Sequence, residues 1–238
     1  AINNWATIHS VRCSSSGSPL VVASTHQSGP TIIQAAPQEE IMHRPKPHGL
    51  PSGYLPTPEL HAFPTFDEGK AFALYYPPAH PHYLGLEYED PPLLVLAHGG
   101  PTGSARNELQ LGLRYWTSRG WAVVDVNYRG STGFGRGYME ELDGEWGIKD
   151  VQDCVAAAEY LVSEGLADPE RLAIKGGSAG GFTVLAALGF HSIFSAGASR
   201  YGVADLETLA LDTHKFESRY LDRLIGQYPD ERNTYVER

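Results

Sequence analysis

The order of apolar and polar residues predicts two kinds of structure along the chain. Near the N-terminus, short β-like runs are separated by the turn sequences SSSG and HQSG, and these runs are Trp5–Val11, Leu20–Ser24 and Thr31–Ala35. Evenly spaced short strands are typical of a sandwich or of one propeller blade. Three strands alone are too few for a stable domain, so we expect this segment to belong to a larger β structure.

Prolines then crowd residues 43–58, where neither a regular helix nor a central strand can form. We interpret this segment as a linker between domains. After it, Glu59–Phe63 and Ala71–Tyr76 flank the turn Asp67-Glu68-Gly69 and predict a hairpin at the edge of the next domain.

Buried strands and helices alternate from Leu93 onward. The expected strands are Leu93–Ala97, Trp121–Val126, Leu172–Ile174 and Phe194–Ser199. Helices are expected at Asn107–Arg119 and Phe182–Leu188, and a further helix is expected to begin at Asp150 as its cap. The charged and aromatic run His214–Asp222 is expected to form a surface or interface helix. Such alternation predicts a right-handed, mainly parallel α/β sheet flanked by helices.

The glycine-rich run from Gly176 to Gly180 carries the first candidate chemistry. Its G-x-S-x-G spacing, between a predicted strand and a predicted helix, is typical of a nucleophile elbow with Ser178 as nucleophile. The N–H of Ala179 would then face a developing oxyanion. Two other interpretations stay open: a tight turn with a serine filler, and a phosphate cradle, although Lys175 precedes the glycines instead of following them.

A second donor is expected in the loop after the first buried strand, which has the sequence His98-Gly99-Gly100-Pro101. We assign this donor to Gly100, with Gly99 as a neighbouring candidate. In this order of motifs the base follows the nucleophile, so His98 is expected to hold the loop by hydrogen bonds rather than to act as the general base.

Four motifs in order extend this pattern: LLVLAHGGPTG, GWAVVDVNYRGSTGFGRGY, WGIKDVQDCVAAAEYLV and DPERLAIKGGSAGGF. Together they resemble the catalytic domain of prolyl oligopeptidase family serine peptidases, particularly the acylaminoacyl-peptidase and dipeptidyl-peptidase-like branch. The resemblance implies an α/β-hydrolase fold over residues 59–238, and a preceding β-propeller that restricts access to short peptides. Residues 1–42 would then be the β-rich remnant of that propeller. By position, Ser178 matches the family nucleophile, and Gly100 and Ala179 match the oxyanion donors.

The family order Ser, Asp, His requires two further βα units after the nucleophile, which take more than about 60 residues with the final loop. We therefore expect the triad Asp and His to lie beyond Arg238, the catalytic domain to be C-terminally incomplete, and the chain alone to be inactive. Four residues after Ser178 are candidates for the missing acid and base, and we expect all of them to be surface or loop residues instead: His191, Asp205, Asp212 and His214.

Two arginines flank the glycine-rich loop after the second parallel strand, where ligands bind in open α/β sheets. Arg129 and Arg136 could meet a substrate carboxylate there. We expect them instead to pair with nearby acidic residues, of which the candidates are Glu140, Glu141 and Asp143.

Composition limits the remaining function classes. The 238 residues are 42% hydrophobic, enough for one full core, and the net charge of −10 argues against nucleic acid and anionic membrane as partners. Cys13 and Cys154 suggest no disulfide framework, which favours a cytoplasmic compartment. The ten histidines show no ligand spacing, so neither a metal nor a cofactor is expected. A homo-oligomer is left open.

Together these observations predict a serine-type peptidase that hydrolyses short peptides through an acyl-enzyme on Ser178. A carboxylesterase or lipase would use the same elbow and donor loop. A non-catalytic α/β-hydrolase scaffold that serves as a binding surface is the alternative from another class.

Overall fold

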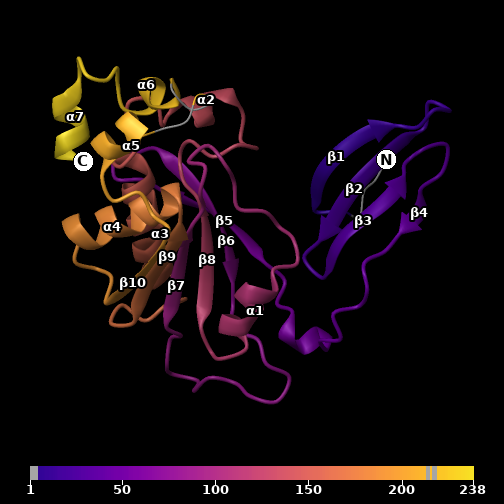
Figure 1. The fold of residues 1–238 in the computed structure, drawn as a ribbon. Helices are drawn as coiled ribbons and strands as arrows, with labels where there is room; N and C mark the ends of the chain where they lie inside the picture. The colour runs from indigo at the N-terminus through magenta and orange to yellow at the C-terminus, as the bar shows by residue number, and fades with distance from the viewer. Residues whose placement is uncertain (1–4, 213–214, 216–218) are drawn as a thin grey trace. The chain divides into compact units, whose positions relative to one another are not determined.

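The computed structural model describes residues 5–212, 215 and 219–238. Two compact units divide the chain (Figure 1). The first unit consists of Ala1–Glu59, Tyr76–Leu84 and Arg106–Gly120, and the second of Leu60–Tyr75, Gly85–Ala105 and Trp121–Arg238.

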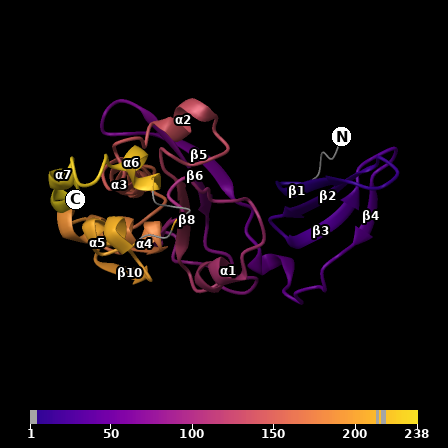
Figure 2. The ribbon, with the colours of Figure 1, turned by 45° about the horizontal axis from the view of Figure 1, so that its top comes forward.

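The first unit contains an antiparallel sheet with strand order β1-β2-β3-β4 (Figure 2). The strands are β1 (Thr7–Cys13), β2 (Pro19–Thr25), β3 (Ser28–Gln34) and β4 (Glu40–His43). Alternating residues of β2 and β3 form its small core of Val21, Ala23 and Ile33. Three of these strands were predicted. The fourth was missed because its four residues, EIMH, show too short an alternation before the prolines begin.

This sheet fits the remnant of a propeller blade, because propeller blades are four-stranded antiparallel sheets. The proline-rich stretch after it holds the short 3₁₀ helix η1 (Ser52–Tyr54). The first unit also includes α1 (Leu111–Thr117), which is shorter than the helix predicted from Asn107 to Arg119.

A second sheet has the order β10-β9-β7-β8-β6-β5 and gives the chain an α/β-hydrolase fold. Its strands are β5 (Glu59–Pro64), β6 (Lys70–Tyr76), β7 (Leu93–Ala97), β8 (Ala122–Asn127), β9 (Leu172–Gly177) and β10 (Ala196–Arg200). The pairs β7–β8, β7–β9 and β9–β10 are parallel. All residues of β8 are buried, as expected for a parallel strand covered on both faces.

Two long helices, α3 (Lys149–Ser163) and α4 (Ala179–Phe190), pack on the parallel strands and on each other. The apolar residues of α3 recur at helical spacing, as predicted, and Val151, Cys154 and Leu161 among them are buried. The expectation for Asp150 was wrong in detail. This residue lies inside the first turn of α3, whose N-cap residue is Ile148.

Short helices follow the long ones in the second unit, and they are α2 (Arg136–Glu140), α5 (Leu206–Asp212), α6 (Tyr220–Leu224) and α7 (Arg232–Glu237). The predicted helix His214–Asp222 falls partly outside the described residues, and α6 contains its last three positions. Among the described helices, we find none with the length and apolar character needed to cross a membrane.

Candidate active site

Ser178 lies at the bend between β9 and α4. Its backbone angles, φ 55° and ψ −124°, are sparsely populated for a residue with a side chain. The Ser178 N–H donates to the Arg200 carbonyl at the end of β10, over a distance of 3.1 Å. The residue itself is exposed. The strained bend thus holds the hydroxyl-bearing side chain at the surface, as a nucleophile elbow requires.

Close backbone approaches explain why glycines surround this serine. A Cβ atom on Gly176 would lie 2.2 Å from the Gly180 carbonyl oxygen. A Cβ atom on Gly180 would lie 2.1 Å from the Ala97 carbonyl oxygen at the end of β7. Both distances are impossible for real side chains, so the first turn of α4 can sit this close to the sheet only with glycine at these positions.

The two residues expected to donate to an oxyanion, Ala179 and Gly100, border the same pocket as Ser178. Ala179 is the first residue of α4, and the first N–H groups of a helix have no acceptor within the helix. Gly100, with φ +85°, lies in the turn after β7. Ser178, Ala179 and Gly100 border one pocket of about 100 Å³, whose other walls are Pro101, Trp146, Val203, Leu209, Tyr220 and Leu221. The pocket is therefore mainly apolar beside the candidate nucleophile.

His98 is held within the loop that precedes Gly100. Its Nε2 lies 2.8 Å from the Ser131 hydroxyl oxygen, and its Nδ1 lies 3.1 Å from the Gly99 carbonyl oxygen. The Tyr128 ring stacks on the imidazole with centroids 4.2 Å apart. Burial lowers the pKa of His98 to about 4. The imidazole contacts its own loop, as we expected from the sequence, and both of its nitrogens are engaged there.

The structure describes three of the four residues after Ser178 that we weighed as a triad acid or base, and they are His191, Asp205 and Asp212. His191 caps the C-terminal end of α4, so the 12 residues of that helix separate it from Ser178 by about 18 Å. Asp205 accepts a hydrogen bond of 2.8 Å from the Thr208 N–H at the start of α5, and this bond lowers the pKa of Asp205. Asp212 is exposed at the end of α5, and His214 lies outside the described residues.

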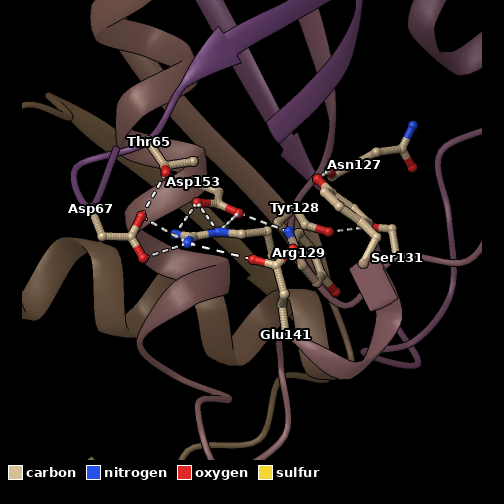
Figure 3. A network of polar contacts seen from close by, with 9 residues as sticks. Thr65, Asp67, Asn127, Tyr128, Arg129, Ser131, Glu141 and Asp153 are labelled. Carbon is tan, nitrogen blue, oxygen red and sulfur yellow. Dashed lines mark hydrogen bonds and ion pairs between the residues drawn. The ribbon is translucent and has the colours of Figure 1, made fainter. Parts of the chain in front are cut away.

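The buried Arg129 side chain forms an ion-pair network that differs from the predicted one (Figure 3). It was expected to pair with Glu140, Glu141 or Asp143. Its closest partners are instead Asp153 of α3, at 2.8 Å from Nη2, and Asp67, at 2.7 Å from Nη1; the Glu141 carboxylate lies farther off, at 3.9 Å. Arg136 does approach Glu140, at 4.0 Å.

The hydrogen bonds of this network join charged groups, the Arg129 guanidinium and the carboxylates of Asp153 and Asp67. Burial alone would lower the pKa of Arg129, but the hydrogen bonds and charges of Asp153 and Asp67 outweigh it and raise that pKa. Hydrogen bonds from Thr65 and Arg129 lower the pKa of Asp67. Within the described part of the chain, no three His, Cys, Asp or Glu side chains are grouped to hold a metal ion.

Sequence reasoning missed the partners that arrange this site. Asp153 was visible only as a polar residue on an amphipathic helix, and Asp67 only as a turn residue. Tyr128 and Ser131, which contact His98, flank Arg129 in the motif NYRGS. A buried aspartate on the apolar side of a helix is the one signal that could have revealed the network, because such a carboxylate needs a partner.

Comparisons with known proteins agree with this architecture. The model of the prolyl oligopeptidase family matches residues 107–238. The chain is 35% identical over 144 residues to dipeptidyl aminopeptidase BIII of Pseudoxanthomonas mexicana, covering 59% of this chain and 21% of that protein. It is 34% identical over 119 residues to the acylamino-acid-releasing enzyme of Arabidopsis thaliana, and this match covers 50% of this chain and 16% of that protein.

Among solved structures, that of a puromycin hydrolase superimposes with a TM-score of 0.93 at 38% identity. The superposition covers 100% of this chain and 36% of that protein. The chain thus spans between about a sixth and about a third of the length of these relatives. Because the family model covers more than half of the chain and the fold and elbow agree with it, the chain belongs to the prolyl oligopeptidase family.

Proposed function

We propose that this chain carries the nucleophile and oxyanion site of a serine peptidase that hydrolyses short peptides. The observation that carries the proposal is the exposed Ser178 at a strained strand-to-helix bend, on the border of a pocket shared with Ala179 and Gly100. Acyl transfer needs a nucleophile beside donors that receive developing negative charge, and these residues offer both.

In the proposed reaction, the Ser178 hydroxyl oxygen attacks the carbonyl carbon of the scissile amide and passes its proton to a general base. The N–H groups of Ala179 and Gly100 donate to the oxyanion. The C–N bond breaks as the leaving amine takes the proton from the base. Water then gives a proton to the base and attacks the acyl carbon, and the Ser178 oxygen leaves and takes up that proton. The pocket, with apolar walls, would hold the side chain next to the scissile bond.

We propose that the base and its orienting acid come from outside residues 1–238. His98 is engaged by Ser131 and Tyr128, and His191 lies at the far end of α4, so neither supports a role as the general base.

We also propose a division of the chain into a propeller remnant at residues 1–42, a linker at 43–58 and a catalytic domain at 59–238. The helix α1, however, falls in the first compact unit.

The substrate class is proposed from the relatives. Their names describe release of acylated amino acids, release of dipeptides and hydrolysis of puromycin. Each name points to amide bonds near the end of a small molecule or peptide. A short peptide or an aminoacyl amide is therefore the substrate that we propose for the intact protein.

The test uses the intact protein and its Ser178→Ala variant. We expect hydrolysis of aminoacyl amides and labelling by a fluorophosphonate probe in the first, and loss of at least about 10³-fold in kcat without labelling in the second. Aryl esters serve as the comparison substrates. Hydrolysis of esters without amides would indicate an esterase, and an unlabelled Ser178 would indicate a non-catalytic scaffold; either result contradicts the proposal.

A further inference from the structure

The tyrosine at the start of α6 contacts both the pocket and the turn that carries the proposed second donor. The Tyr220 hydroxyl donates to the Gly100 carbonyl oxygen over 2.9 Å, and the Thr102 hydroxyl oxygen lies 2.9 Å from the Tyr220 hydroxyl oxygen. Tyr220 is also a wall of the pocket that Ser178 and Gly100 border. It therefore joins two parts of the site that are 120 residues apart in the chain.

The carbonyl of Gly100 is the group through which the fold can hold the peptide unit after this glycine. That unit ends at the nitrogen of Pro101, which carries no hydrogen, so the unit can accept hydrogen bonds but cannot donate one. Gly100 itself has a φ of +85°, and the backbone of a glycine is only weakly restrained by sterics. The orientation of the Gly100 turn therefore depends on the donors to its carbonyl.

Two residues supply such donors, and they differ in what they fix. Thr102 lies in the same turn, and both its N–H and its hydroxyl donate to the Gly100 carbonyl, the hydroxyl over 3.2 Å. Tyr220 donates from a separate helix. A contact within the turn moves with the turn, whereas a contact from another element holds the turn relative to the rest of the site. Tyr220 therefore relates the position of Gly100 to the pocket.

The backbone of α6 is fixed on the fold, but the Tyr220 side chain is less constrained. Leu221 and Leu224 are buried, and the Leu224 carbonyl accepts a hydrogen bond of 3.2 Å from the N–H of Trp146, another wall of the pocket. The Tyr220 side chain is only half-buried. A ligand that packs on it in the pocket would therefore remove rotational freedom that the side chain otherwise keeps.

We propose that Tyr220 is a positioning residue that couples occupancy of the apolar pocket to the oxyanion site. A substrate side chain in the pocket packs on Tyr220 and fixes the ring, and the hydroxyl then holds the Gly100 carbonyl so that the Gly100 N–H stays directed at the oxyanion. This inference rests on the proposed function. It names the substrates that react fastest as those with an apolar side chain large enough to reach Tyr220. The binding energy of that side chain then raises kcat as well as lowering KM.

The test compares two substrates in the intact protein and in its Tyr220→Phe variant, which keeps the ring and removes the hydroxyl. The substrates are aminoacyl amides with a leucine or an alanine side chain next to the scissile bond. In the wild type we expect kcat to be about 10-fold higher for the leucine amide. Tyr220→Phe should lower kcat about 10-fold for the leucine amide and less than about threefold for the alanine amide, with both KM values changed less than about twofold.

Tyr235→Phe is the matched control. It removes a tyrosine hydroxyl that donates to the Gly226 carbonyl at 2.6 Å, and neither of these residues lines the pocket. This variant should keep kcat for both amides within about twofold of the wild type, and thermal unfolding checks the fold of both variants. In Tyr220→Phe, an unchanged kcat, an equal loss with the two amides or a change confined to KM would overturn the inference. The same losses in Tyr235→Phe would overturn it as well.

Crystal structures of the intact wild-type protein and of Tyr220→Phe give a second readout that needs no turnover. In the variant we expect the Gly100 carbonyl to rotate and the φ of Gly100 to move away from +85°. A Gly100 turn that is the same in both structures would overturn the inference. An inactive wild-type protein would instead contradict the proposed function, and the two crystal structures would then decide whether Tyr220 sets the Gly100 turn.

Discussion

At the scale of single residues, the backbone of Ser178 is strained. Its positive φ of 55° with ψ of −124° is a conformation that glycine adopts readily and that costs other residues about 1–3 kcal/mol. The strain persists because β9, α4 and the hydrogen bond to Arg200 hold the bend from both sides. The strained bend thus lowers the stability of the fold but holds the Ser178 side chain exposed between β9 and α4.

The strain predicts that glycine is the more stable replacement at this position. Ser178→Gly should unfold with a free energy about 1 kcal/mol higher than Ser178→Ala, because glycine relieves the strained φ while both variants lack the hydroxyl. Urea unfolding of the two variants measures the difference. An alanine variant as stable as the glycine variant would show that the bend is not strained in solution.

At the scale of elements, one buried carboxylate joins the two long helices. Asp150, in the first turn of α3, accepts a hydrogen bond from the Gly147 N–H and another from the Thr183 hydroxyl of α4, both at 2.6 Å. Burial raises the pKa of Asp150 to about 6 in spite of these bonds. The link therefore holds the elbow helix to α3 through a carboxylate whose charge is disfavoured by its surroundings.

This raised pKa predicts a pH dependence with a definite sign. The folded protein holds the Asp150 proton more tightly than the unfolded chain, whose pKa is the usual 3.8. The stability that the protonated Asp150 contributes is therefore fully present below pH 3.8 and is lost as the pH rises through about 6. Asp150→Asn keeps the shape without titrating, so its free energy of unfolding relative to wild type should rise by about 3 kcal/mol between pH 3.5 and pH 7.5.

Urea unfolding of both proteins across this pH range tests the expectation. Comparison with the asparagine variant removes the contributions of all other titrating groups, which the two proteins share. A difference that stays constant with pH would mean that Asp150 keeps an ordinary pKa in the folded protein.

At the scale of the whole molecule, the parallel sheet gathers the candidate site. Gly100 follows β7, the segment Tyr128–Ser131 follows β8, Ser178 follows β9 and Val203 follows β10. The carboxyl ends of parallel strands lie on one edge of a sheet, so residues far apart in the chain meet there. The pocket bordered by Ser178, Gly100 and Val203 is the result.

The same arrangement predicts that residues 1–238 alone hydrolyse peptides poorly. Among the residues that the structure describes, His98 is engaged within its own loop and His191 lies at the far end of α4, so neither supports a role as the base for Ser178. We expect kcat for an aminoacyl amide at least about 10³-fold below that of the intact protein, with circular dichroism to check folding. Hydrolysis at a comparable rate that Ser178→Ala abolishes would reveal a base within these residues.

Much of the fold and the elbow could be predicted from the sequence, because local patterns encode them. Continuous apolar runs indicated β7 and β8, and the spacing GGSAG indicated the bend at Ser178. Boundaries were less accurate: β9 continues to Gly177 and α4 begins at Ala179, since glycines that appear to break elements are used here for close packing. The strand β4 was missed because four residues carry too little periodicity.

By itself, the sequence determined the type of sheet, the place of the strand-to-helix bend at Ser178 and the loop in which we expect the second donor, because each depends on residues close together in the chain. Only the tertiary structure decided that Arg129 binds Asp153 and Asp67, and that His98 lies between Ser131 and the Gly99 carbonyl. These partners come from different strands and helices, and a buried charge or imidazole is compatible with many partners until the packing of the sheet brings one set within hydrogen-bond distance.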